Sequence, residues 1–156
     1  MRHEWLVSRR AALGALSVAC ALVFGLGVSQ ARAQARPDDA HRDRVYLTQL
    51  ALLVDGARRL IAFSENNLDD RELLKFAHPL AERYVEMAGH MLPPPKSAVV
   101  HPHLLLVVEN LERALDSAVA ADTAGYQKRI RIARDELANL EAVLKQLKLR
   151  LPESPR

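Results

Sequence analysis

Cysteine, tryptophan and aromatic residues in general are scarce in this chain. It has one cysteine, one tryptophan and 4% aromatic residues, and both Cys20 and Trp5 fall within the first 35 positions. The rest of the chain therefore has no thiol for a disulfide, for sulfur-ligated zinc or for covalently attached c-type haem. The six glycines of the full chain are scattered and form no phosphate-binding loop, and no serine lies in a nucleophile motif. We therefore do not expect an enzyme.

The first 35 residues have the pattern of an export signal. Arg9 and Arg10 belong to a basic start, an apolar segment spans 11–28, and small residues offer cleavage sites at 31–33 and 33–35. We expect residues 1–35 to be a signal peptide and the protein to be periplasmic.

Two questions about this segment stay open. The sequence from Ser8 to Leu13 resembles a twin-arginine signal, so either the Sec or the twin-arginine route fits. The apolar segment is also near the lower length limit for a membrane-spanning helix. An uncleaved anchor, which would hold the protein at the membrane, is therefore an alternative.

The basic character of the full chain comes from its first 35 residues. The chain has 22 lysines and arginines against 19 acidic residues; removing Arg2, Arg9, Arg10, Arg32 and Glu4 leaves 18 against 18. A chain without net charge gives no general electrostatic attraction to nucleic acid, so we expect no nucleic-acid partner.

Apolar residues recur at steps of three and four along the remaining chain, which predicts four amphipathic helices. We expect a polar leader at 36–43, a helical domain at 44–151 and a tail at 152–156. The first helix covers 44–64. Its apolar positions are Leu47, Leu50, Val54, Ala57 and Ile61. Gly56 lies inside it, where we expect close packing against another helix.

The second helix follows a capping box in which Asp69 is the predicted N-cap and Glu72 lies three residues further on. Pro79 either bends this helix or marks a start near His78. The predicted core positions of the second helix are Leu73, Ala77, Leu80, Tyr84, Met87 and Met91.

The sequence Pro93-Pro94-Pro95-Lys96 separates the second helix from the third. Pro102 suits the first turn of the third helix, and Asp122 with Thr123 supplies the N-cap of the fourth. The apolar positions of the third and fourth helices are Leu104, Val108, Leu111, Leu115 and Ala118, then Tyr126, Ile130, Ala133, Leu137, Leu140, Leu144, Leu147 and Leu151. With short turns and no strand patterns, we predict an all-α, antiparallel up-down-up-down four-helix bundle.

The histidines are the candidate metal ligands. His90 lies beside Met87 and Met91 near the end of the second helix, and His101 and His103 flank the start of the third. Imidazoles suit copper, zinc or nickel, and thioethers favour Cu(I). A tight proline connection would place these five residues at one end of the bundle. Packing roles for the methionines explain the same pattern, so the metal site is an alternative.

In overall plan, residues 44–151 resemble the soluble periplasmic b-type cytochromes and the cytochrome c-prime group. The shared features are the helix pattern, the Pro94-Pro95-Lys96 connection and the turn from Asp122 to Gly125. The resemblance implies a four-helix bundle. Those families ligate haem through a histidine near the end of the last helix, and none occurs between 126 and 156, so haem is not expected.

The sequence thus leaves three functional hypotheses. The first is an exported, non-enzymatic bundle that binds an unknown protein or small ligand through an exposed helix face or its proline-rich end. The second is a metal-binding module that uses His90, His101, His103, Met87 and Met91. The third is an accessory or sensor subunit held at the membrane by an uncleaved helix. The oligomeric state is not specified by the sequence.

Overall fold

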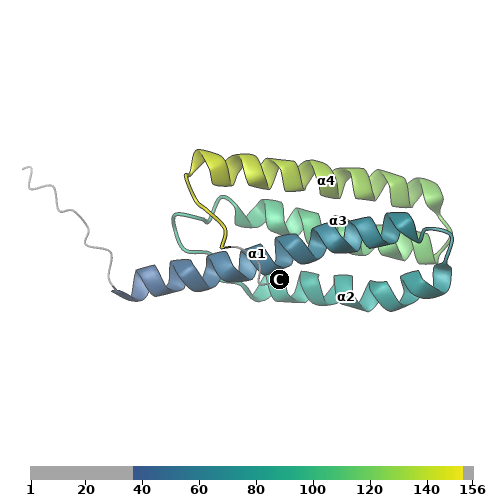
Figure 1. Ribbon diagram of the computed structural model, residues 1–156, viewed down its shortest axis with the longest axis horizontal. Helices are drawn as coiled ribbons and strands as arrows, with labels where there is room; N and C mark the ends of the chain where they lie inside the picture. Colours follow the sequence, from purple (N-terminus) through teal and green to yellow (C-terminus); the bar gives the residue numbers. More distant parts are fainter. Residues whose placement is uncertain (1–36, 153–156) are drawn as a thin grey trace, which may run out of the picture. The chain divides into compact units, whose positions relative to one another are not determined.

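The computed structural model describes residues 37–152, and over this range the protein is all-α. Four helices follow one another: α1 (Pro37–Asn66), α2 (Arg71–His90), α3 (His101–Val119) and α4 (Thr123–Gln146) (Figure 1). This confirms the predicted fold class of a four-helix bundle. The predicted signal peptide, the first residue of the leader and the last four residues of the tail lie outside the described range. Within that range, no helix has the length and apolar character needed to cross a bilayer.

Helix α1 begins at Pro37, earlier than the start predicted at residue 44. The predicted leader at 36–43 is therefore helical from Pro37 onwards. Proline suits the first helical position because its missing amide hydrogen has no partner there in any case. Asp39 follows in the first turn, where its negative charge is favourable beside the positive end of the helix dipole.

The caps of α2 and α4 are aspartates that lie directly before each helix. Asp70 caps α2 by accepting a hydrogen bond from the Leu73 amide at 3.1 Å, so the predicted cap at Asp69 is displaced by one residue. Asp122 caps α4, as predicted, by accepting from the Gly125 amide at 2.9 Å. Pro79 lies inside α2, which begins well before it at Arg71.

Helix α4 ends at Gln146, before the predicted end at Leu151. The next residues close the helix with bonds from the Lys148 amide to the Lys145 carbonyl, 3.1 Å, and from the Leu149 amide to the Leu144 carbonyl, 2.9 Å. Leu147, a predicted core position, is 39% exposed, whereas Leu149 and Leu151 pack against the core after the helix has ended.

The core of the bundle receives side chains from all four helices. Helix α3 packs most extensively against α4 and then α2, while α1 makes smaller interfaces. Buried alanines occur on every helix: Ala51 and Ala57 of α1, Ala77, Ala81 and Ala88 of α2, Ala114 and Ala118 of α3, and Ala133 of α4.

Two contacts join different helices across the bundle. Gly56 of α1 confirms the predicted close packing, because a Cβ atom added there would lie 2.5 Å from the Tyr84 hydroxyl of α2. Late in α1, the buried Ser64 hydroxyl is hydrogen-bonded at 2.9 Å to the hydroxyl of Tyr126, which is early in α4.

The buried face of α2 differs from the predicted one. Leu74, Ala81 and Ala88 are buried, while Leu73 and Leu80, which were predicted to be core, are 40% and 45% exposed. Each exposed position directly precedes a buried one in the sequence. Because both members of the pair Leu73-Leu74 are apolar, periodicity alone cannot decide which of them faces the core.

Candidate binding groove between α1 and α2

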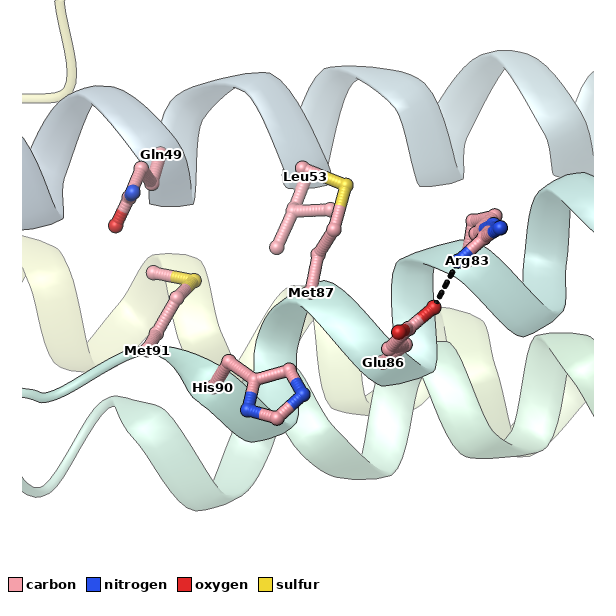
Figure 2. A pocket seen from close by; sticks show the side chains of 7 residues that line it. All are labelled: Gln49, Leu53, Arg83, Glu86, Met87, His90 and Met91. Carbon is pink, nitrogen blue, oxygen red and sulfur yellow. Dashed lines mark hydrogen bonds and ion pairs between the residues drawn. The ribbon is translucent and has the colours of Figure 1, made fainter.

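A groove follows the seam between α1 and α2. One part, about 360 Å³, is lined by Gln49 and Leu53 of α1 and by Arg83, Glu86, Met87, His90 and Met91 of α2. A second part, about 560 Å³, shares Gln49, His90 and Met91 and continues along His41, Arg42, Val45, Tyr46, Leu92 and Pro93. Figure 2 shows Met87 rising from α2 towards Leu53, which points down from α1. The groove floor is thus thioether and aliphatic.

An exposed band of large apolar side chains begins at this groove and continues beyond it along α1 and α2. We call this band the apolar strip. It consists of Val45 (42% exposed), Leu52 (48%) and Phe63 (37%) of α1, and Leu73 (40%), Phe76 (81%), Leu80 (45%) and Met87 (48%) of α2. Val45 and Met87 line the groove itself, which fixes the sides of the two helices that carry the strip.

The spacing within each helix keeps the strip on one side of it. On α2 the steps are three, four and seven residues, and on α1 they are seven and eleven, all close to whole helical turns. The two rows therefore form one surface across the seam. Exposed apolar groups that gather in this way mark an interaction surface more often than isolated ones do.

The charged side chains beside the strip form ion pairs within their own helix. Arg59 is bound to Asp55 at 2.9 Å, Lys75 to Glu72 at 2.6 Å, and Arg83 to Glu86 (Figure 2). Each pair is locally neutral and largely solvated, so it contributes little to stability. These three ion pairs add no net charge beside the strip, whereas Arg42 adds a positive charge at the second part of the groove.

The structure separates the five predicted metal ligands. Met87, His90 and Met91 all line the groove, and Met91 is buried while Met87 is 48% exposed. His90 points away from the two methionines in Figure 2. The side chains of His101 and His103 lie elsewhere: His101 faces Tyr46 of α1, and the Nδ1 atom of His103 is 2.8 Å from the Glu136 carboxylate of α4. Across residues 37–152, no three histidine, cysteine, aspartate or glutamate side chains gather as a metal site.

The contact between His101 and Tyr46 is a packing contact in a partly buried place. The Tyr46 hydroxyl lies 3.4 Å from the His101 Nδ1 atom, and the two rings are tilted with centroids 6.0 Å apart. Burial lowers the pKa of His101 and raises the pKa of Tyr46 to about 12. Both shifts favour the neutral forms, so this pair closes the end of the core without carrying charge.

Comparison with protein-family models, with curated proteins and with solved structures found no match for the chain. The functional interpretation therefore rests on geometry. Sequence patterning missed the apolar strip because it assigned Leu73, Leu80 and Met87 to the core. The signal that could have revealed it is the excess of apolar residues on α2, where both 73/80/87 and 74/81/88 are apolar. A helix that packs on the core of a bundle through one apolar face needs only one of these two sets of residues.

Proposed function

We propose that this protein is a non-enzymatic binding protein, delivered to the periplasm by its N-terminal segment, and that the apolar strip contacts its partner. The observation that carries the proposal is the exposure of seven large apolar side chains on one seam of a small bundle. Leaving them in water is unfavourable, and covering them would contribute about 25 cal/mol for each Å² of apolar surface removed from water.

The chemistry of the strip supports an apolar helix face as its counterpart. The groove between α1 and α2 offers aliphatic, aromatic and thioether groups, while the flanking charges are already paired. An amphipathic helix laid in such a groove gains apolar contacts at every turn. The likeness to the periplasmic cytochromes contributes the bundle plan to this proposal and no cofactor.

Site-specific photo-crosslinking in the native host tests the proposal. A photo-reactive group attached at Leu80→Cys samples the strip, and one at Ala138→Cys samples an exposed position on α4; both are made in a Cys20→Ser background. We expect one defined adduct from the strip position and none from the control. Adding Phe76→Glu should abolish the adduct, since a charge in the strip must be desolvated on binding.

Phe76→Glu should leave folding intact, because the Phe76 side chain is 81% exposed and surface substitutions change stability by about 0.5 kcal/mol or less. Loss of the adduct can then be ascribed to the surface. Equal crosslinking from both positions, or none from either, would contradict a specific binding face on α1 and α2.

A further inference from the structure

A second exposed apolar cluster lies at one end of the bundle, where Leu92 joins it to the second part of the groove. The loop 91–100, between α2 and α3, and the segment 147–152, after α4, lie at this end (Figure 1). Three aliphatic side chains protrude from them: Leu92 is 89% exposed, Val99 58% and Leu147 39%. Leu92 precedes three consecutive prolines, which restrict the backbone around it.

Four basic side chains accompany these aliphatic groups. Lys96 is exposed in the same loop, and Lys145, Lys148 and Arg150 are exposed around the end of α4, where the last three line a hollow of about 540 Å³. None of the four takes part in an ion pair with another described residue, whereas Glu141, the acid that lines the same hollow, is bound to Arg58. These four side chains therefore contribute positive charge that no ion pair within residues 37–152 offsets.

Lys148 occupies a backbone conformation that lysine rarely adopts. Its φ is 54°, in the left-handed region, at the position after α4 where glycine usually closes a helix. Glycine would satisfy the same two closing hydrogen bonds without strain. The Lys148 side chain adds a cation to the hollow.

We propose that this end, composed of Leu92, Lys96, Val99, Lys145, Leu147, Lys148 and Arg150, docks on the surface of an anionic phospholipid bilayer. Basic side chains are attracted to acidic headgroups, and protruding aliphatic groups enter the boundary between headgroups and acyl chains. The pairing of cations with aliphatic tips favours a bilayer over nucleic acid. A nucleic-acid surface would use aromatic stacking or polar donors at those tips.

Vesicle co-sedimentation tests this docking. The protein is purified from its host, so that its N-terminus is in the state that processing in the cell produces. We expect binding to phosphatidylcholine vesicles that contain phosphatidylglycerol, weakened by salt, and much weaker binding to phosphatidylcholine alone. Each basic residue near such a surface contributes roughly a fivefold factor. The triple variant Lys145→Gln, Lys148→Gln and Arg150→Gln should therefore lower the partition coefficient roughly 100-fold.

The matched control is Arg113→Gln, Lys128→Gln and Arg131→Gln, which removes three exposed positive charges from other parts of α3 and α4. It should retain most of the binding. A second variant, Lys148→Gly, separates a membrane role from a structural one: it should raise the melting temperature by relieving the backbone while weakening vesicle binding roughly fivefold. Equal losses in both triple variants, unchanged binding in the first, equal binding to uncharged vesicles, or no binding at all would each overturn the proposal.

Discussion

Two non-glycine residues with positive φ mark where the helices of this bundle close. Lys148 follows α4, and Ala121, with φ 62°, follows α3. At Ala121 the chain turns so that the Asp122 amide reaches the Ser117 carbonyl at 2.8 Å, which places Asp122 to cap α4. Sequence alone predicted the cap, because aspartate has a strong preference there. It did not predict the left-handed residue before the cap, because alanine carries no signal for that conformation.

Replacing Ala121 by glycine should stabilise the bundle. Glycine adopts the left-handed region without the steric penalty that a Cβ atom imposes, and this gain exceeds the extra freedom glycine has in the unfolded chain. We expect the free energy of unfolding to rise by about 1 kcal/mol in urea denaturation. Ala120→Gly is the matched control: its φ of −75° needs no glycine, so the same change should reduce stability there.

At the scale of the helices, the sequence predicted their number, order and most of their turns. The prolines, the aspartate caps and the regular apolar spacing determine these, and all are local properties of the chain. The helix ends were less predictable. Leu147 and Leu151 continue the apolar spacing of α4, but the helix closes at Gln146 and Leu151 reaches the core from an irregular segment. The spacing of apolar residues indicates which residues contact the core, but it does not show whether those residues belong to a helix.

Two helix glycines should respond in opposite ways to the same substitution. Gly89 of α2 has nothing within 4 Å of an added Cβ, so Gly89→Ala should raise stability by about 0.5 kcal/mol through helix propensity. At Gly56 an added Cβ would lie 2.5 Å from the Tyr84 hydroxyl, and moving that ring should outweigh the propensity gain. We expect Gly56→Ala to cost about 1 kcal/mol net. Chemical denaturation of both variants measures the difference, and equal gains would refute the close contact.

At the scale of the whole molecule, burial of the tyrosines sets an alkaline limit on stability. Burial raises the pKa of Tyr46 from 10.0 to about 12 and also raises the pKa values of Tyr84 and Tyr126. Above pH 10 the unfolded chain loses phenolic protons that the bundle retains. The stabilisation is therefore complete below pH 10 and declines as the pH rises above it, for Tyr46 by up to about 1.4 kcal/mol per pH unit towards pH 12.

Ultraviolet titration of tyrosine in the folded and the urea-unfolded protein measures this effect. We expect the folded midpoint to lie above the unfolded one, and Tyr46→Phe to reduce the gap. Coincident midpoints would contradict the burial of these rings.

The candidate site was the least predictable level. The grouping of Met87, His90 and Met91 along one groove follows from their spacing on a single helix. The separation of His101 and His103 does not, because it depends on which neighbours the first turn of α3 faces. The exposure of Leu73, Leu80 and Met87 likewise depends on how α2 rotates against α1 and α3, which is a property of the assembled core.

The small interfaces of α1 have a consequence for how binding and folding are coupled. Because α1 makes smaller interfaces than the other three helices, its displacement breaks the fewest contacts between helices and is the least costly partial opening of the bundle. The apolar strip spans the seam that such an opening would separate. A ligand held across this seam binds only the closed form, and by mass action it stabilises the least stable part of the fold. Binding of the partner would then also stabilise the folded bundle against this opening.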